Sequence, residues 1–221
     1  HAVRDTGLGD VDHKFSKNFR KTLGLLRDLT GTRSVGIISE DTAQGMVEIA
    51  RPVGVVGAIT PSTNPVATPT NKVMNALKGR NAIILAPSPR GEAVCGELIT
   101  LFQSALEAVG APSALVQKLP APMDKTATEL LMRAVDLVVA TGSQNNIRAA
   151  YSSGTPAVGV GAGNVAVIVD ETAECPGVAE KILASKTFDN ATSCSSENSV
   201  VVVDSAYDAL VASLESRGAL M

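Results

Sequence analysis

The sequence has few of the residues that carry metal or hydrolytic chemistry. It contains three Cys and two His in 221 residues, and both histidines, His1 and His13, lie in a polar segment near the N-terminus. The cysteines, Cys95, Cys175 and Cys194, show no Cys-x-x-Cys spacing. This odd, widely spaced set argues against a disulfide framework and a Cys/His zinc site. It indicates reduced thiols, as expected of a cytoplasmic protein.

Aromatic residues, long apolar runs and excess charge are also lacking. Aromatics make up 3% of the chain against 45% hydrophobic residues, and Trp is absent. Val, Ala, Leu and Ile must therefore fill the core, as is common in parallel α/β sheets. No apolar run approaches the ~20 residues of a membrane span, and the first ten residues lack the apolar segment of a signal peptide. The net charge of -3, with scattered basic residues, argues against nucleic acid or a membrane as the main partner.

The N-terminal region is expected to contain a helix and a hairpin. Residues 10–30 have the spacing of an amphipathic helix, so we expect a surface helix packed through one face. Its apolar positions are Phe15, Phe19, Leu23 and Leu26, and Lys14, Lys17, Arg20 and Lys21 are expected to face away. Two strands within residues 34–51 predict a hairpin that is either an oligomerisation arm or a plain edge hairpin. Both ends of the chain look cut, so we expect it to be part of a longer protein.

From residue 53 onward the pattern predicts an α/β fold with a doubly wound parallel sheet. Strands are expected at 53–59, 82–86, 115–118, 135–140 and 157–160, and helices at 65–78, 92–109, 125–133 and 143–153. This regular alternation implies a parallel sheet covered on both faces. We expect residues 1–160 to form a nucleotide-binding domain. Residues 161–221 are expected to open a second α/β domain.

Three strand ends carry residues that suit a nucleotide. Ligands of such sheets bind beyond the carboxyl ends of the strands, and each of these ends leads into a helix whose free N–H groups favour phosphate. The candidates for cofactor binding are Thr60, Pro61, Ser62, Ser88, Arg90, Thr141, Gly142 and Ser143. Singly, each end is a capped turn, and Ser143 alone would be an N-cap. Their convergence on one edge favours a nucleotide site.

The glycine-rich segment 159–164 does not qualify as a dinucleotide-binding loop. Its spacing is GxGxG rather than GxGxxG, and a predicted strand at 165–169 follows it instead of a helix. We expect its glycines to let the backbone pass close to a ligand or to a second domain, and Gly161 is a further candidate for cofactor binding.

Cys194 is the candidate nucleophile. It lies in a run of small polar residues between a predicted helix at 178–186 and a predicted strand at 200–203, where a substrate can reach its thiol. Cys95 lies in an apolar helix and fits a buried packing role. Cys175, beside a proline, is expected in an exposed loop.

A reachable thiol beside a nucleotide-binding sheet favours one chemistry in particular. No histidine lies near Cys194 in the sequence, so a Cys–His hydrolase has weak support. A thiolate can instead add to an aldehyde, after which a nicotinamide accepts hydride and a thioester remains. Asn64, at a strand end, is the candidate donor to the oxyanion formed on the way.

Residues 60–65, 140–143 and 188–194 resemble the aldehyde dehydrogenase superfamily, and the resemblance extends over essentially the whole chain. It implies that Cys194 is the catalytic cysteine, that Asn64 supports the oxyanion and that NAD or NADP is the cofactor. Segments 149–154, 159–164 and 185–190 are similar to the CoA-acylating branch. The segment 191–198 is most similar to members that act on sulfoacetaldehyde. The implied partners are a small aldehyde, CoA and further copies of the chain in a homo-dimer or higher homo-oligomer.

Two positions depart from the pattern of many relatives. Hydrolytic members carry a glutamate that activates water, and the aligned residue here is Gly159. Without that carboxylate, water competes poorly as acyl acceptor, and a thiol such as CoA is favoured. A lysine that follows the second strand in many relatives is replaced by Ala86, and Arg90 comes a few residues later. Arg90 either meets the 2′-phosphate of NADP or is a surface residue.

Two other functions stay open at this point. One is a non-acylating aldehyde dehydrogenase that hydrolyses the thioester with another base. The second is a nucleotide-binding or assembly fragment that is inactive on its own.

Overall fold

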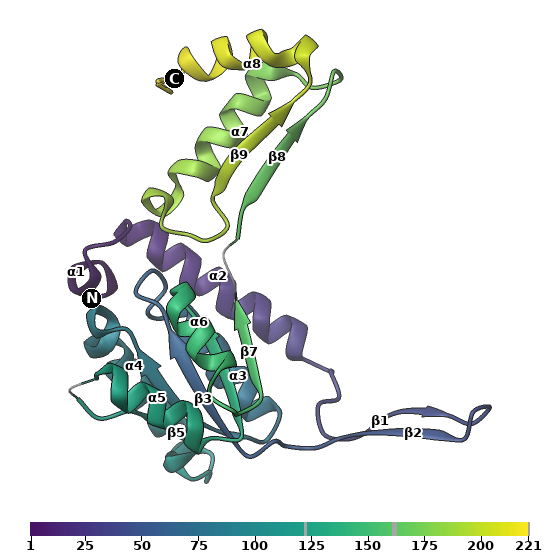
Figure 1. Cartoon of the computed structure of the whole chain (residues 1–221), viewed down its shortest axis with the longest axis vertical. Helices are drawn as coiled ribbons and strands as arrows, with labels where there is room; N and C mark the ends of the chain where they lie inside the picture. Colours follow the sequence, from purple (N-terminus) through teal and green to yellow (C-terminus); the bar gives the residue numbers. More distant parts are fainter. Residues whose placement is uncertain (122, 161–162, 221) are drawn as a thin grey trace.

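The central element is a five-stranded parallel sheet. The computed structural model describes residues 1–121, 123–160 and 163–220 (Figure 1). The strand order is β5-β4-β3-β6-β7, with β3 in the middle. The strands are β3 (Val55–Thr60), β4 (Ala82–Pro87), β5 (Val116–Lys118), β6 (Leu137–Thr141) and β7 (Ala157–Val160). All neighbours pair in parallel, so their carboxyl ends lie at one edge of the sheet.

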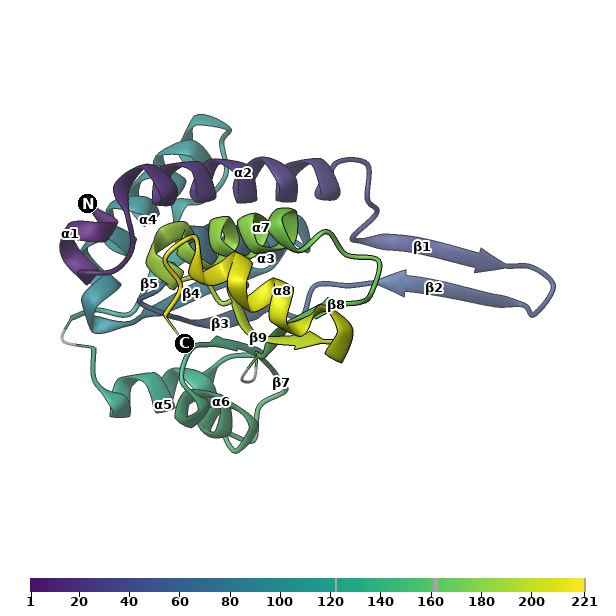
Figure 2. The ribbon, with the colours of Figure 1, turned by 90° about the horizontal axis from the view of Figure 1, so that it is seen from above.

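Helices cover both faces of this sheet, which confirms the predicted doubly wound α/β fold. One face carries α3 (Ala67–Lys78) and α4 (Glu92–Ala108), and the other carries α5 (Lys125–Ala134) and α6 (Gln144–Tyr151), as Figure 2 shows. Two short 3₁₀ turns, η1 (Pro89–Gly91) and η2 (Ser113–Leu115), flank α4. Two apolar clusters fill the layers, one around Ile83 and Leu85 and one around Met132 and Val138. Aliphatic side chains dominate both clusters, as the composition predicted.

The N-terminal helix packs through the face opposite to the one predicted. α1 (Ala2–Thr6) is followed by α2 (Val11–Leu29), which Asp10 caps by accepting from His13 N at 3.0 Å. The predicted surface helix is present, but its buried residues are Lys14 and Lys17, while Phe15 is 72% exposed. Lys14 and Lys17 turn inward because the buried carboxylate of Asp189 lies there.

The predicted hairpin is present and extends away from the sheet (Figure 1). It consists of β1 (Gly36–Asp41) and β2 (Met46–Ala50), paired antiparallel. The carboxylate of Asp41 accepts hydrogen bonds from the backbone N–H groups of Ala43 and Gln44, which fixes the turn. The role of this arm in oligomerisation stays a prediction.

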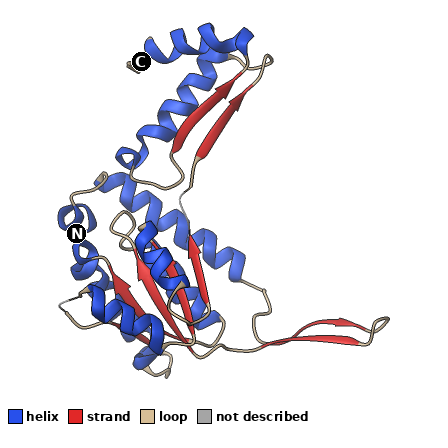
Figure 3. Cartoon of the chain, in the orientation of Figure 1, coloured by secondary structure: helices blue, strands red, loops and turns tan. Residues whose placement is uncertain are grey.

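A second, smaller α/β unit follows the central sheet. Its strands β8 (Val165–Val169) and β9 (Glu197–Val202) pair in parallel beside α7 (Cys175–Thr187) and α8 (Asp204–Glu215), as Figure 3 shows. The 3₁₀ turn η3 (Phe188–Ala191) links α7 to the segment of Cys194. The expected start of a second α/β unit is therefore confirmed, whereas the domain boundary at 160/161 stays a prediction.

Cys175 was expected in an exposed loop, and this expectation is wrong. It is the first residue of α7, is 8% exposed and lies in an apolar cluster with Ala179 and Leu210. Pro176 explains the difference. A proline suits the first turn of a helix because its missing N–H would have no partner there. The pair Cys175-Pro176 therefore begins a helix instead of forming a loop.

Among the helices of the described residues, none is both long and apolar enough to cross a membrane.

Candidate active site

A cavity of about 920 Å³ lies at the carboxyl ends of β3, β4 and β6. Such a cavity is where ligands of parallel sheets bind. Most of the predicted cofactor-binding residues line it. They are Thr60, Pro61, Ser62, Ser88, Thr141, Gly142 and Ser143. The structure therefore brings the three strand ends singled out in the sequence to one site.

Polar groups of this cavity are left without partners. Thr60 Oγ1 and Ser88 Oγ are buried and make no hydrogen bond within the described residues. Ser143 caps α6, because its hydroxyl accepts from Asn146 N at 3.3 Å, and it lines the cavity as well. Gly142, with φ 148°, adopts a backbone conformation that suits glycine. Orphaned hydroxyls beside a helix N-terminus are the groups that a nucleotide would satisfy.

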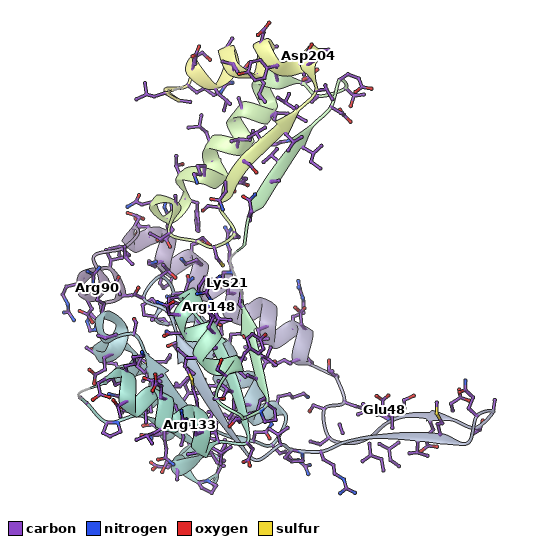
Figure 4. The ribbon with its side chains drawn as sticks, in the orientation of Figure 1. Lys21, Glu48, Arg90, Arg133, Arg148 and Asp204 are labelled. Carbon is purple, nitrogen blue, oxygen red and sulfur yellow. The ribbon has the colours of Figure 1, made fainter. Side chains whose placement is uncertain are left out.

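Arg90 is the predicted cofactor residue that does not join this group. Arg90 is exposed and is not part of the cavity lining. Gly161 lies outside the described residues. Two cations that the sequence analysis did not single out, Lys125 and Arg148, do line the cavity. Figure 4 labels Arg90 and Arg148, which come from different elements. Only the fold reveals Arg148, because it lies on α6, beyond the strand-end residues that the sequence highlighted.

Cys194 is exposed and follows an unusual turn. Asp189, Asn190 and Ala191 have φ values of 54°, 51° and 57°, which is the left-handed region that few non-glycine residues adopt. After them, Ser196 N donates to Ser193 O at 3.0 Å and closes a turn around Cys194. The three left-handed residues turn the chain sharply between α7 and the thiol. The exposure of Cys194 and the burial of Cys95 agree with the sequence prediction.

The carboxylate of Asp189 stabilises this turn through buried hydrogen bonds. Its side chain is fully buried and accepts from Lys14 Nζ at 2.9 Å, from Lys17 Nζ and from Thr192 Oγ1 at 2.8 Å. Its other oxygen accepts from Asp10 N at 3.1 Å. Burial alone would raise the pKa of Asp189, but the hydrogen bonds from Lys17, Lys14 and Thr192 outweigh it and lower the pKa to about 2. The carboxylate is therefore ionised and compensates the buried ammonium groups.

Lys14 connects the cysteine segment to the strand end of Asn64. Its ammonium donates to Thr63 O at 2.7 Å as well as to Asp189 and, at 3.3 Å, to Thr192 Oγ1. Thr63 precedes Asn64, and Thr192 is two residues before Cys194. One buried cation therefore touches the two segments that carry the predicted catalytic residues. A faint signal for it is present in the sequence, since Lys14 and Lys17 are three residues apart on one helix face.

The side chain of Asn64 is only weakly engaged. Its amide nitrogen is 3.5 Å from Thr63 Oγ1, and its Oδ1 is buried with no partner in the part of the chain that the structure describes. The amide N–H groups are thus available to a ligand.

His13 is near the cysteine segment in space, although it is distant in sequence. Its Nδ1 accepts from Asp189 N at 3.0 Å, and its ring contacts Phe188 with 4.6 Å between centroids. The lone pair of Nδ1 is therefore used by the backbone of the turn. This contact gives His13 a structural role. Its Nδ1 therefore does not support the interpretation of the site as a Cys–His hydrolase.

A second cavity of about 400 Å³ lies along the segment of Cys194, although Cys194 itself is not among the residues that line it. Both neighbours of the cysteine, Ser193 and Ser195, line it. The complete lining consists of Lys181, Ala184, Ser185, Phe188, Ser193, Ser195 and Ser196. None of these residues lines the larger cavity. The cysteine segment therefore borders a separate space, small and rich in hydroxyl groups.

Comparison with known proteins identifies the family of the chain. The sequence profile described as "Aldehyde dehydrogenase family" matches residues 4–219. The chain belongs to this family. It is 61% identical over 220 residues to the acylating sulfoacetaldehyde dehydrogenase of Cupriavidus necator, covering 100% of this chain and 45% of that protein. The chain thus spans about half the length of the curated relatives it matches.

Solved structures of acylating aldehyde dehydrogenases have the same fold. An acetylating aldehyde dehydrogenase from Geobacillus thermoglucosidasius matches with a TM-score of 0.92 and 40% identity, over 99% of this chain and 49% of that one. A propionaldehyde dehydrogenase from Rhodopseudomonas palustris, with bound CoA and an acylated cysteine, matches with a TM-score of 0.83 and 32% identity, over 98% and 49%.

Gly159 is packed against a tyrosine in this structure. A Cβ atom at Gly159 would lie 2.9 Å from Ile147 Cγ2 and 3.0 Å from Tyr151 Cε2. The hydroxyl of Tyr151 also accepts from Gly159 N at 3.0 Å. The position that aligns with the glutamate of hydrolytic relatives therefore has no room for a longer side chain without displacing Ile147 or Tyr151.

Proposed function

We propose that this chain is part of a CoA-acylating aldehyde dehydrogenase that converts sulfoacetaldehyde to its acyl-CoA with NAD or NADP. The closed position at Gly159 is the observation that carries the choice of CoA over water. A general base must lie within hydrogen-bond reach of the water it activates. Tyr151 and Ile147 occupy the space where that base would enter. The relatives named above support the acylating reaction, and the one from Cupriavidus necator supports the substrate.

The other nearby carboxylate is a poor replacement for that base. Glu197 begins β9, three residues after Cys194. The hydrogen bond from the hydroxyl of Ser185 lowers the pKa of Glu197. A lowered pKa makes a carboxylate a weaker proton acceptor, so Glu197 is not suited to activate water.

The larger cavity suits the cofactor. Thr60 and Ser88 would donate their unpaired hydroxyls to it, and the N-terminus of α6 at Ser143 would face its pyrophosphate. When bound, the nicotinamide supplies a hydride acceptor. The 2′-phosphate of NADP would need a cation, and Arg148 and Lys125 line the cavity while Arg90 does not. Comparison of turnover with NAD and with NADP distinguishes the two cofactors.

Cys194 and Asn64 would carry the reaction at the aldehyde carbon. The Cys194 thiolate adds to the carbonyl carbon and forms a thiohemiacetal, whose oxyanion accepts a hydrogen bond from the Asn64 amide. Loss of hydride from that carbon leaves a thioester on Cys194. The CoA thiolate then attacks the thioester carbonyl, the C–S bond to Cys194 breaks, and the enzyme thiolate is restored. In the net reaction, aldehyde, CoA thiol and oxidised cofactor give acyl-CoA, reduced cofactor and one proton.

The full-length enzyme tests this function directly. Purified enzyme is incubated with sulfoacetaldehyde and NAD or NADP, with and without CoA, and acyl-CoA and reduced cofactor are measured. Steady turnover is expected only with CoA, whereas steady turnover in its absence would indicate a hydrolytic enzyme. Cys194→Ala should abolish acyl transfer and retain cofactor binding, and Cys95→Ala serves as the matched control. Full activity of Cys194→Ala would contradict the assignment of Cys194 as the nucleophile.

We further propose that the enzyme is a cytoplasmic homo-oligomer. The β1–β2 arm supports this, since Ile37, Met46, Val47 and Ile49 on it are each about half exposed. The free thiols of Cys95, Cys175 and Cys194 support a reducing compartment. Analytical ultracentrifugation of the full-length enzyme and of a variant without residues 37–49 would test the role of the arm. A monomeric wild-type enzyme would contradict it.

A further inference from the structure

We propose that the cavity lined by Ser193 and Ser195 is the subsite for the anionic head group of the aldehyde, and that Lys181 is the cation that selects this head group. The inference rests on the proposed function and names what its substrate must carry. In sulfoacetaldehyde a single methylene separates the carbonyl carbon from the sulfonate. When Cys194 attacks that carbon, the sulfonate must therefore lie against residues next to the cysteine. Ser193 and Ser195 flank Cys194, and both line this cavity.

The lining offers donors that a sulfonate needs. Its side chains include the hydroxyls of Ser193, Ser195 and Ser196 and the ammonium of Lys181. Ser193 Oγ and Ser195 Oγ are 2.9 Å apart and share one hydrogen bond, so one of the two protons remains for a ligand. Ser185 is the exception, because its hydroxyl bonds to Glu197. A sulfonate has three oxygens that share one negative charge, and such a group is best bound by several donors at once.

Ser196 points independently to a ligand. It is only 5% exposed, and its Oγ is buried without a hydrogen-bond partner among the described residues. Burial of an unpaired hydroxyl costs free energy, and such groups in native proteins usually have an unseen partner. Because Ser196 lines the cavity, an acceptor atom placed there would satisfy it.

Lys181 supplies the charge. The ion pairs found within the described ranges do not include Lys181, so its ammonium has no carboxylate partner there. Lys181 is the charged residue among those that line the cavity. Lys186 donates to the carbonyl of Glu197 at 2.8 Å and is committed to the backbone. Lys181 is thus the cation of the lining that a sulfonate can pair with.

The test compares two aldehydes of similar length on the full-length enzyme. Sulfoacetaldehyde carries the sulfonate, and propionaldehyde carries a methyl group in its place. Loss of one charge-assisted hydrogen bond to the substrate corresponds to a roughly tenfold to hundredfold decrease in kcat/KM. We expect Lys181→Met to lower kcat/KM for sulfoacetaldehyde by that factor and to leave propionaldehyde within about twofold. Lys181→Arg should retain most of the preference, and Ser196→Ala should weaken it in the same direction.

Two controls keep the result interpretable. Lys21→Met removes an exposed charge on α2, far from the cavity in sequence, and should change neither substrate. Ethanesulfonate, measured as a competitive inhibitor or by calorimetry, should bind wild-type enzyme and Lys21→Met equally and Lys181→Met more weakly. This binding measurement serves even if a variant loses turnover.

The outcomes separate this inference from the function on which it rests. Equal losses for both aldehydes in Lys181→Met, or no loss with sulfoacetaldehyde, would overturn the subsite. A wild-type enzyme that forms acyl-CoA only from neutral aldehydes overturns the subsite and leaves the acylating reaction standing. A wild-type enzyme that turns over without CoA overturns the acylating function, whereas the ratio between the two aldehydes still reports on Lys181.

Discussion

Lys14 and Asp189 are separated by 175 residues in the chain, yet they form a buried ion pair with Lys14 Nζ 2.9 Å from Asp189 Oδ2. The same ammonium donates to Thr63 O at 2.7 Å. It therefore links the turn before Cys194 to the segment of Asn64, and it does so from a third element, α2. In this arrangement the relative position of thiol and amide depends on a lysine that contacts neither of them in the described structure.

Replacing Lys14 should therefore impair turnover more than cofactor binding. Lys14→Met leaves Thr63 O without its donor and removes one of the donors to Asp189. A buried polar group that loses its partner costs about 1–3 kcal/mol of stability. We expect a lower melting temperature and a fall in kcat of about tenfold or more, because about 1.4 kcal/mol in the barrier is tenfold. The KM for NAD(P) should stay within about twofold.

Lys21→Met on the same helix is the matched control, since Lys21 is exposed. Comparing the kcat of Lys14→Met with its melting temperature distinguishes a loss of positioning in the site from a loss of folding stability. A variant that is stable at the assay temperature yet retains wild-type kcat would contradict the positioning role of Lys14.

The orientation of α2 shows where prediction from sequence stops. Helical spacing correctly gave the helix and sorted its apolar and basic residues onto opposite faces. It could not tell which face turns inward, because the answer depends on Asp189, far along the chain. Burial of Lys14 and Lys17 is tolerable only when an ionised carboxylate accepts from both. Apolar periodicity carries no information about such a partner.

The turn at Ala191 predicts a simple order of tolerated side chains. Ala191 has φ 57°, where a Cβ atom costs roughly 1–2 kcal/mol and a β-branched side chain costs more. Glycine removes that cost but adds about 0.5–1 kcal/mol of unfolded-state entropy. We therefore expect Ala191→Gly to have near wild-type stability and activity. Ala191→Val should lower both the melting temperature and kcat. Equal stability of the Val and Gly variants, measured by thermal unfolding, would contradict a left-handed residue at this position.

Cysteine alkylation should single out Cys194. Burial raises the pKa of Cys95 to about 12, so its thiolate is scarce at neutral pH. Cys175 is 8% exposed and is packed in the core of the second unit, whereas Cys194 is exposed. Brief treatment of native enzyme with iodoacetamide, followed by peptide mass spectrometry, should modify Cys194 first, with parallel loss of activity. Early modification of Cys95 would show that its helix opens readily. In the Cys194→Ala variant, labelling should fall to the level of the buried thiols.

The two cavities differ in how far the sequence predicts them. The cofactor cavity follows from topology, since the carboxyl ends of parallel strands share one edge wherever the strands lie. The cavity at Cys194 depends on how α7 packs against the turn, which brings Lys181 and Ser196 together across fifteen residues of chain. No regular period relates those residues. The need for a cation beside a sulfonate can be stated from chemistry alone, but its position requires the fold.

Lys72 should make the stability of the enzyme depend on pH above neutrality. It is 8% exposed on α3, and its Nζ donates to Val139 O at 2.6 Å. Burial lowers the pKa of Lys72 from 10.5 to about 7. Between these values the unfolded chain holds a proton that the folded chain has released. Stability therefore rises with pH across this window, by up to about 1.4 kcal/mol per pH unit from this group.

Lys72→Met removes the titrating group and should remove that slope. We expect the difference in unfolding free energy between wild-type enzyme and Lys72→Met to shift in favour of the wild type as pH rises from about 7.5 to 9.5. Urea unfolding at several pH values measures it, and Lys21→Met should follow the wild type throughout. Other groups titrate in the same range, but they contribute equally to both proteins and cancel in the difference. Parallel profiles for wild type and Lys72→Met would mean that Lys72 stays protonated in the fold, held by Val139 O strongly enough to offset its burial.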